Sequence, residues 1–450
     1  MTHKKMLRSS TVLTAATFAM TAVIALSMAA NAEDAKPADA AAAPTPAADA
    51  PPPGYYINGI HLGVQFDAGF YGNANNPQSG VNVGQSFTDR SNSILLNQAL
   101  FTVEKALDKK ATDYDFGFKV QAMYGTDARY THFLNELSNV TSQRTQLDIV
   151  EVAFLAHTPW LTEGGMDFTV GQYPTMMGFE TIDPSTNPFY SHSYIFNYSL
   201  PFKHTGALAV THVIPELDIY TQIDTGNQTS FGSPGGDNNG AIAGMVGVGS
   251  TLMDGNLTIL ALSHFGPEQP IGMPGGTLPG VGGLANKYFR VYNDAFVTYK
   301  YDDKLSFTTE FSWVHDALGY NTNGQKGADA YGAAQYVTYA LTDTIALNAR
   351  GEIFRDQNNF FVASFPNSLG PVQALGGRAP ATLLPAAITG TTYGAITLGF
   401  TYKPAVPDTI TTLLIRPEVR YDGSLSGGKP YNDQSNSGAF FFGADVVLGF

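Results

Sequence analysis

The chain has 450 residues, no cysteine and a formal net charge of −14. The absence of cysteine excludes a disulfide framework and a lipid-modified N-terminal cysteine. The acidic balance argues against nucleic acid as a partner, because binding a phosphate backbone requires a basic face.

The N-terminus has the pattern of an export signal. Lys4, Lys5 and Arg8 precede an apolar stretch, and a small-x-small cleavage pattern ends at Ala32. We therefore expect a Sec signal peptide over residues 1–32. A retained membrane anchor is the weaker alternative, because the apolar part is short. Cleavage takes the net charge from −14 to −17, since the leader holds three basic residues and no acidic one.

The next segment, residues 33–56, is rich in Ala and Pro and almost free of large side chains. It cannot bury a core, so we expect a disordered or extended spacer. Mean hydropathy over the whole chain is −0.06. After the leader, no segment has the roughly 18 consecutive apolar residues that a membrane-spanning helix needs.

From residue 59 onward, apolar and polar side chains alternate. In the first such segment, Ile60, Leu62, Val64, Phe66, Ala68 and Phe70 alternate with His61, Gly63, Gln65, Asp67 and Gly69. The same period returns in residues 113–125 and 438–450. Because successive side chains of a strand point to opposite faces, these segments predict two-faced β-strands.

About sixteen segments of this kind follow one another. We expect strands near 59–71, 94–105, 113–125, 147–157, 165–176, 206–214, 216–224, 240–251, 256–265, 288–300, 304–315, 331–341, 344–355, 391–403, 410–422 and 438–450. The connections between them alternate between long loops and short turns such as MDGN and YDDK. That order is typical of a bacterial outer-membrane barrel, with short periplasmic turns and long extracellular loops.

Aromatic residues gather at the ends of the expected strands. Phe70, Tyr71, Tyr124, Trp313 and Tyr421 lie near long loops, and Tyr299, Tyr301, Tyr339, Tyr402 and Phe450 lie near short turns. Aromatic side chains prefer the headgroup level of a membrane. Aromatic residues are also common in strands generally, but their gathering at both strand ends favours two membrane girdles.

These patterns predict an all-β fold over residues 57–450: a closed antiparallel transmembrane β-barrel of about 16 strands. Lipid offers backbone groups no hydrogen-bond partner, so a sheet can span a membrane only when it closes on itself. At this strand number, side chains do not fill the interior and an aqueous lumen remains. The expected environment is outer-membrane lipid of a Gram-negative bacterium.

Several segments, taken in order, resemble one family of outer-membrane proteins. They are YGTDARYT (124–131), VGQYPTMMGFETIDP (170–184), NPFYSHSYIFNY (187–198), PFKHTG (201–206), ARGEIFRDQNN (349–359) and RPEVRYDGS (416–424). The set is similar to the putative β-barrel porin-2 family. The resemblance implies a barrel porin and supplies no catalytic residues. Segment 360–390, rich in Ala, Leu, Pro and Gly, departs from the pattern as an insertion.

The alternation directs ten charged side chains toward the lumen. They are Asp67, Asp115, Lys119, Glu310, Arg350, Glu352, Arg416, Glu418, Arg420 and Asp445. Two interpretations of the dense segment IRPEVRYD remain open: a basic stripe that screens solutes by charge, or Arg and Glu residues that pair and stiffen the wall. Pro417 cannot donate to a strand ladder, so we expect a local irregularity there.

The third long connector, residues 177–205, is crowded with aromatic residues. Such a segment is too apolar to remain free in water, so it must pack. By analogy with general porins, we expect it to enter the lumen and narrow it; packing as an outer cap is the alternative. The candidate residues of the constriction are Glu180, Asp183, Tyr190, His192, Tyr194 and His204.

The sequence gives no sign of an enzyme, a cofactor or a metal centre. It contains neither G-x-S-x-G nor H-E-x-x-H, and GVGST at 247–251 lacks the ending of a phosphate-binding loop. Metal binding by His192 and His204 is a weak hypothesis, because no third ligand is fixed.

Three functions fit these features. The favoured one is a passive diffusion channel for small hydrophilic solutes, with a constriction at 177–205. The alternatives are a substrate-selective channel whose loop aromatics guide a sugar or similar ligand, and a non-conducting surface barrel. The terminal Phe450 is typical of barrels inserted by the outer-membrane assembly machinery. Whether the barrel works alone or as a homo-oligomer stays open.

Overall fold

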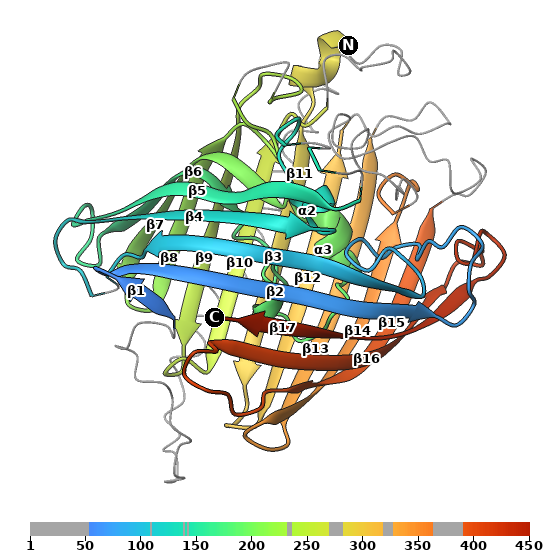
Figure 1. Ribbon diagram of the computed structural model, residues 1–450. Coiled ribbons are helices and arrows are strands. Elements are labelled where there is room, and N and C mark those ends of the chain that lie inside the picture. The colour runs from blue at the N-terminus through green and yellow to red at the C-terminus, as the bar shows by residue number, and fades with distance from the viewer. Residues whose placement is uncertain are drawn as a thin grey trace.

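The computed structural model describes residues 54–108, 110–137, 140–141, 144–231, 236–269, 282–317, 327–362 and 390–450. Most of them belong to one antiparallel sheet (Figure 1). The strands are β1 (Tyr55–Ile57), β2 (Ile60–Asn73), β3 (Ser93–Lys105), β4 (Asp115–Gly125), β5 (Gln146–Thr158), β6 (Met166–Pro174), β7 (Lys203–Ile214), β8 (Leu217–Asp224), β9 (Ala243–Leu252), β10 (Leu257–Gly266), β11 (Arg290–Lys300), β12 (Leu305–Asp316), β13 (Ala328–Ala340), β14 (Ile345–Asp356), β15 (Thr391–Tyr402), β16 (Thr412–Ser424) and β17 (Gly438–Gly449). The expected signal peptide lies outside the described residues, as do all but the last three residues of the expected spacer 33–56 and nearly all of the insertion at 360–390.

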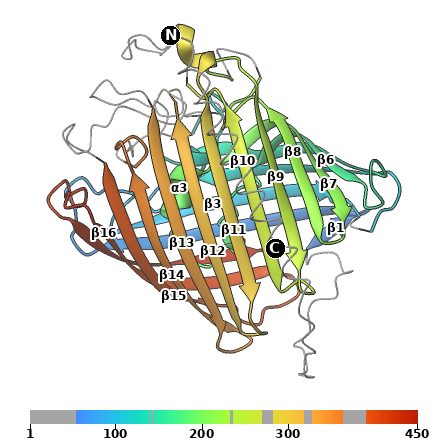
Figure 2. The same ribbon diagram turned by 180° about the vertical axis from the view of Figure 1, so that it is seen from behind.

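The sheet closes on itself (Figures 1 and 2). Each strand from β2 to β17 pairs antiparallel with its neighbour in sequence, and the last strand pairs with β2 from Phe441↔Asn73 to Gly449↔Gln65. The terminal residue continues this seam, because Phe450 N donates to Val64 O at 2.9 Å. The short strand β1 pairs with β2 through three residue pairs. The sequence prediction of a closed barrel of 16 strands is therefore confirmed.

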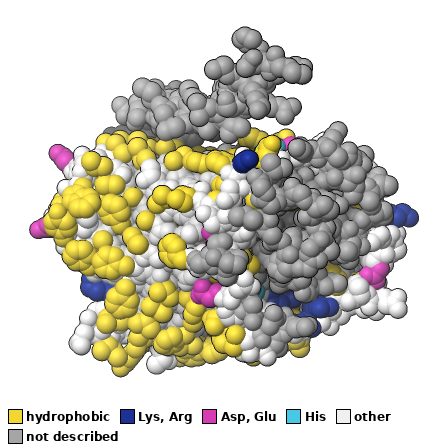
Figure 3. Space-filling view, turned by 90° about the horizontal axis from the view of Figure 1, so that it is seen from above, with side chains coloured by type: hydrophobic (Ala, Val, Ile, Leu, Met, Phe, Trp, Pro, Cys, Tyr) yellow, Lys and Arg dark blue, Asp and Glu magenta, His cyan; other side chains and the backbone are white. Residues whose placement is uncertain are grey.

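The outer face of the barrel is apolar. Phe116, Phe311 and Ile396 expose 53, 58 and 62% of their surface on three different strands. In Figure 3, hydrophobic side chains form broad patches and charged side chains are sparse over the part of the surface that is described. Exposed apolar bands of this kind suit contact with acyl chains.

The aromatic residues expected at the membrane interfaces behave in two ways. Phe70, Tyr124, Tyr421, Tyr301, Tyr339, Tyr402 and Phe450 are exposed, as a girdle requires. Tyr71 is different, because it follows Phe70 and points inward. Its hydroxyl donates to Glu418 Oε1 at 3.2 Å, and its ring is fully buried. For Tyr71 the girdle prediction is wrong, since the alternation of the strand turns it toward the interior.

Long loops and short turns alternate along the ring. The β9–β10 connection spans only residues 253–256, whereas the β6–β7 connection spans 175–202. In the short turn, Met253, Asp254 and Gly255 all adopt positive φ. Such a backbone favours Gly and Asp and reverses the chain tightly.

Two irregularities help to shape the interior. The β15–β16 ladder is interrupted between Gly399↔Glu418 and Tyr402↔Ile415, at the level of the predicted irregularity of Pro417. Between β2 and β3, the register moves from Asp67↔Gln98 to Ala68↔Leu96 and leaves Asn97 as an extra residue. This bulge buries the side chains of both Asn97 and Gln98.

The interior is not uniformly polar. Wall residues Met123, Phe354 and Tyr393 are buried in one hydrophobic cluster with loop residues, including Phe87 and Tyr194. On the side of the long loops the interior is therefore partly apolar, because the loops bring their own aromatic side chains inside. Among the described residues, no helix is long and apolar enough to cross a membrane.

Candidate functional site

The connection 175–202 between β6 and β7 runs along the inner side of the barrel wall. It holds the 3-10 helix η1 (Pro184–Thr186) and the helix α3 (Tyr194–Ser199), which contacts β11 to β14 from within (Figures 1 and 2). Both helices begin at a capping side chain: Asp183 accepts from Ser185 N, and Ser193 accepts from Phe196 N. These local caps explain why such short turns form. We call residues 175–202 the inner loop.

Glu180 anchors the inner loop to the wall. Its Oε1 accepts from Arg350 Nη1 at 2.6 Å and from the Tyr336 hydroxyl at 3.1 Å. Its Oε2 accepts from Ser193 N at 2.8 Å and lies 3.1 Å from His192 Nδ1. Burial opposes the charge on this carboxylate, but the Arg350 guanidinium and the His192 contact prevail and lower the pKa of Glu180 to about 2.

Wall carboxylates accept hydrogen bonds from the loop backbone. The donors and acceptors are Gly178 N to Asp294 Oδ1 (3.1 Å), Phe179 N to Glu310 Oε1 (2.9 Å), Tyr190 N and Ser191 N to Glu418 Oε2 (2.9 and 3.1 Å), and Tyr194 N to Glu352 Oε2 (2.7 Å). These bonds satisfy backbone donors that the irregular loop cannot pair within itself. Four strands therefore hold one loop through hydrogen bonds from its backbone to their acidic side chains.

Wall guanidinium groups bind the loop carbonyls. Arg416 Nη1 donates to Pro184 O at 2.6 Å and to Asn187 O at 2.7 Å. Arg420 Nη1 donates to His192 O at 2.9 Å. The same guanidinium groups also pair with wall carboxylates: Arg416 with Asp445, Arg420 with Asp422 (2.5 Å) and Glu352 (3.1 Å), and Arg350 with Glu352 (3.0 Å).

This arrangement bears on the two interpretations of the segment IRPEVRYD (415–422), which are a basic stripe that screens solutes and Arg and Glu residues that pair within the wall. Arg416, Glu418 and Arg420 are buried, and each contacts the inner loop. The structure favours pairing within the wall, and it adds a role that the sequence did not reveal, since the same residues hold the loop. The interpretation as a basic stripe that faces solute stays an untested prediction, and in this structure the inner loop covers the stripe.

The other predicted lumen charges divide between covered and open positions. Asp67, Glu310, Arg350, Glu352 and Asp445 are buried on the side of the barrel that the inner loop covers. In this structure other side chains and the inner loop surround these five, so their role as pore-lining residues stays a prediction. Asp115 lies at the start of β4, next to the short connection, with Lys105 Nζ 3.3 Å away.

The aromatic and histidine residues of the inner loop pack inward. Tyr194 stacks on Tyr393 with ring centroids 5.2 Å apart, and its hydroxyl donates to Asp422 at 3.1 Å. His192 stacks on Phe196 at 4.0 Å. The Tyr190 hydroxyl donates to Asn97 Oδ1 at 2.8 Å. Tyr190, His192 and Tyr194 are buried by these contacts, and a role for the loop aromatics in guiding a sugar stays an untested prediction.

A smaller set of polar groups faces open space. On the inner loop, Thr181 and Thr186 are exposed and Asp183 is half-buried. On the wall beside them, Gln65 Nε2 donates to Asp183 Oδ1 at 2.9 Å. Lys119 remains partly exposed and lies 3.0 Å from Glu151 Oε2. We call this set, completed by Thr102, Glu104 and Gln121, the open polar face.

Sequence reasoning identified only two members of the open polar face, Asp183 and Lys119. It missed Glu151, the buried partner of Lys119, because the β4–β5 register shifts between Gln121 and Ala122, which breaks simple alternation along β5. It also missed Asp294, although strand parity alone places Asp294 on the inner face of β11. His204 joins neither the open polar face nor His192; it contacts Asp224 and His264.

Comparison with known proteins agrees with this architecture. Residues 59–450 match the sequence model of the family described as putative beta-barrel porin-2, OmpL-like. No curated protein matches the chain in sequence. Among solved structures, an anion-selective porin from Comamonas acidovorans has a TM-score of 0.54 at 7% identity and covers 87% of this chain and 99% of its own.

Two further structures share the fold. OprB of Pseudomonas putida, at high pH, has a TM-score of 0.51 at 12% identity, with 87% of this chain and 94% of its own covered. OmpF of Salmonella typhi, in complex with daunomycin, has a TM-score of 0.51 at 9% identity, with 88% and 99% covered. At these identities the likeness concerns the fold alone.

Proposed function

This chain belongs to the putative β-barrel porin-2 family of outer-membrane barrels, and we propose that it works as a passive diffusion channel for small hydrophilic solutes. Solutes pass along the open polar face, between the exposed side of the inner loop and the wall of β2 to β5. The observation that supports this route is the contrast in burial: Thr181, Thr186 and Lys119 remain accessible, while the charges behind the loop do not.

The proposed channel prefers cations weakly. On the open polar face, the single cation Lys119 is paired with Glu151, and Glu104 and Asp183 add further negative charge. The buried arginines contribute little to the field along this route, because each lies beside a carboxylate. The net charge of the chain is also negative, which favours cations in the same way.

The remaining assignments of this proposal concern export and assembly. The leader 1–32 directs Sec export, residues 33–56 form a spacer ahead of the barrel, and the assembly machinery recognises the last strand. Support for the last point comes from the seam, where Phe450 N and O both pair with Val64. Before the barrel closes, the backbone N–H and C=O of Phe450 have no strand partner and are available to the assembly machinery.

A non-conducting barrel is the second candidate function. One observation favours it: wall residues Met123, Met245 and Leu262 are buried on the inner face even though their strands, β4, β9 and β10, supply none of the acidic side chains that hold the loop backbone. A barrel filled to this extent on the side of the long loops has less room for solute.

Single-channel recording in planar bilayers tests both candidates. Steady ohmic conductance, with a reversal potential of cation sign in a KCl gradient, supports the proposed channel. Conductance that one class of solute blocks supports a selective channel. A correctly folded barrel without conductance overturns the proposal in favour of the filled barrel. Folding is checked by heat-modifiable migration in gel electrophoresis, so that silence and misfolding are distinguished.

A further inference from the structure

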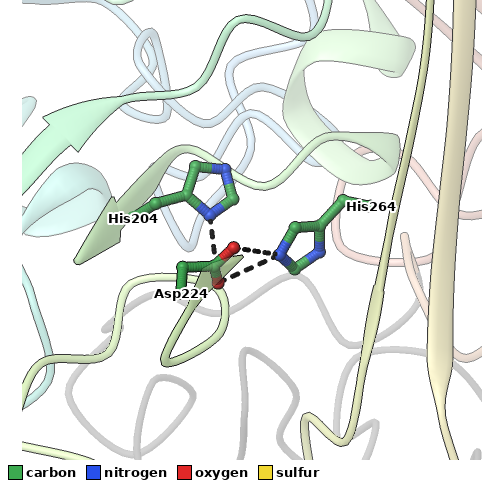
Figure 4. A group of neighbouring side chains, drawn as sticks. All are labelled: His204, Asp224 and His264. Atoms are coloured by element: carbon green, nitrogen blue, oxygen red, sulfur yellow. Dashed lines mark hydrogen bonds and ion pairs between the residues drawn. The ribbon is translucent and has the colours of Figure 1, made fainter. Parts of the chain in front are cut away.

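Three side chains from β7, β8 and β10 meet on the inner face of the barrel, close to its long-loop end. They are His204, Asp224 and His264 (Figure 4). Their strand neighbours Ile223 and Phe265 are exposed on the outer face, so alternation turns Asp224 and His264 inward. The side chains of all three are fully buried.

The donor atoms of this cluster converge. His204 Nδ1 lies 3.5 Å from Asp224 Oδ1, and His264 Nε2 lies 3.1 and 3.2 Å from the two oxygens of Asp224. All three ligand atoms fit within 4.8 Å of one another. Bonds of about 2.0–2.2 Å from a tetrahedral zinc ion hold neighbouring ligand atoms about 3.3 Å apart, which is close to the distances seen here.

Outer hydrogen bonds fix the orientation of Asp224 and His204. The Asp224 carboxylate accepts from Gly226 N at 2.7 Å and from Gln222 Nε2 at 2.6 Å. His204 Nε2 lies 3.2 Å from Thr175 Oγ1, and His264 Nδ1 lies 4.0 Å from Glu268 Oε1. Metal-binding imidazoles usually direct their second nitrogen to an oxygen acceptor, as His204 does here, whereas the His264–Glu268 distance is longer than a hydrogen bond.

Two buried atoms of the cluster lack a hydrogen bond, His204 Nδ1 and His264 Nδ1. His204 Nδ1 is fully buried, faces Asp224 at 3.5 Å and has no hydrogen-bond partner among the described residues. A buried polar atom without a partner costs free energy, and a bound cation would remove that cost. The two imidazoles approach each other at 4.7 Å between centroids, with the carboxylate beside them.

We propose that His204, Asp224 and His264 bind a divalent transition-metal ion, with Zn²⁺ as the best fit. Imidazole nitrogens favour Zn²⁺ over Ca²⁺ and Mg²⁺, which take oxygen ligands. Three protein ligands leave a fourth position for water. The ion fastens β7, β8 and β10 to one another and, through the Thr175 contact, to the start of the inner loop. Its role is structural, because the ligands are closed to solvent.

Zinc titration of the untagged, refolded, chelator-treated barrel tests this site. Isothermal titration calorimetry should show one Zn²⁺ per chain, and His204→Ala and His264→Ala should each weaken binding by about tenfold or more. His212→Ala is the matched control. It removes an imidazole that contacts two carboxylates, Asp218 at 2.7 Å and Asp167 at 3.2 Å, but lies half-exposed at a short turn. Binding in this control should be unchanged.

The result that overturns the proposal is absence of stoichiometric zinc binding by the natural chain, binding only at millimolar zinc, or equal loss in His212→Ala. A second measurement needs no variant. Co²⁺ bound to a four-coordinate nitrogen and oxygen site gives strong visible absorption bands, whereas surface-bound Co²⁺ gives weak ones. Strong bands that Zn²⁺ displaces support the site, and weak bands alone refute it even if the histidine variants fail to fold.

Discussion

Two groups of charged side chains point from the wall into the barrel. One group is covered by the inner loop and the other remains open. In β14 and β16, Arg350, Arg416 and Arg420 are buried under the inner loop, and each contacts a carboxylate and a loop carbonyl. In β4, Lys119 is held by Glu151 but remains partly exposed. A charge that points into a barrel is therefore not always a charge that a solute meets. On the covered side it holds a loop, and only on the open side can it select ions.

Deleting residues 182–200 removes most of the inner loop. The charges that the loop covers should then become accessible, like those of the open polar face. The ends can be rejoined, because Pro174 and Lys203 are already paired across β6 and β7. We expect conductance to rise severalfold, since the loop no longer occupies the interior. Single-channel recording measures the change. Unchanged conductance would show that the inner loop does not limit the pore.

The double substitution Arg416→Glu with Arg420→Glu should release the inner loop from the wall. Removing one partner of a buried ion pair costs about 3–5 kcal/mol, and here the new carboxylates also face Asp445 and Asp422. We expect a lower unfolding temperature, and proteolytic cleavage within the loop. Limited proteolysis followed by mass spectrometry locates the cut.

The control for this variant is Lys119→Glu, which makes the same kind of charge reversal at one position of the open polar face, half the charge change of the double substitution. It should leave the inner loop resistant to protease. Equal sensitivity in both variants would contradict the assignment of an anchoring role to the arginines.

Acid should weaken the attachment of the inner loop through Glu180. Its pKa in the folded protein, about 2, lies below the usual 4.5. Its ionised form therefore stabilises the fold fully above about pH 4.5, and this contribution is lost as the pH falls toward 2. Thermal unfolding followed by circular dichroism should show Glu180→Gln less stable than the natural chain at pH 7, with the gap closing below pH 4.5. A gap that stays constant in acid would be inconsistent with this anchor.

Neutralising Asp183 should produce the smallest change. A unit charge about 10 Å away in water is worth about 0.4 kcal/mol, which corresponds to about a twofold change in local cation concentration. Asp183→Asn should therefore reduce cation preference by about that factor, measured as the reversal potential in a KCl gradient. Asp445→Asn, the same substitution at a covered position, should lower stability without moving the reversal potential of the folded channel. If Asp445→Asn moved the reversal potential and Asp183→Asn did not, the assignment of ion selection to the open charges would be wrong.

Much of the fold follows from local patterns. All sixteen expected strands lie within three residues of the observed ends, because a period of two and the turn residues are properties of neighbouring positions. The irregularity at Pro417 follows from the missing N–H of proline. Tyr71 was misassigned because proximity to a strand end does not tell which face a residue occupies.

The site was harder to predict for a physical reason. Glu180, His192 and Tyr194 were recognised as polar or aromatic members of a loop, but their partners Arg350, Phe196 and Tyr393 lie up to 199 positions away or on the loop itself. Which wall residues a loop covers depends on where it enters the closed ring. No local pattern encodes that position.

By itself, the sequence determined a closed barrel of sixteen strands with an apolar outer belt and an apolar-aromatic third loop, since alternation and turn chemistry act between adjacent residues. Only the tertiary structure decided which inward charges are covered, which stay open, and that His204, Asp224 and His264 meet. Those outcomes depend on burial and on contacts between strands distant in sequence, where a carboxylate or an imidazole is satisfied by whatever the folded wall places beside it.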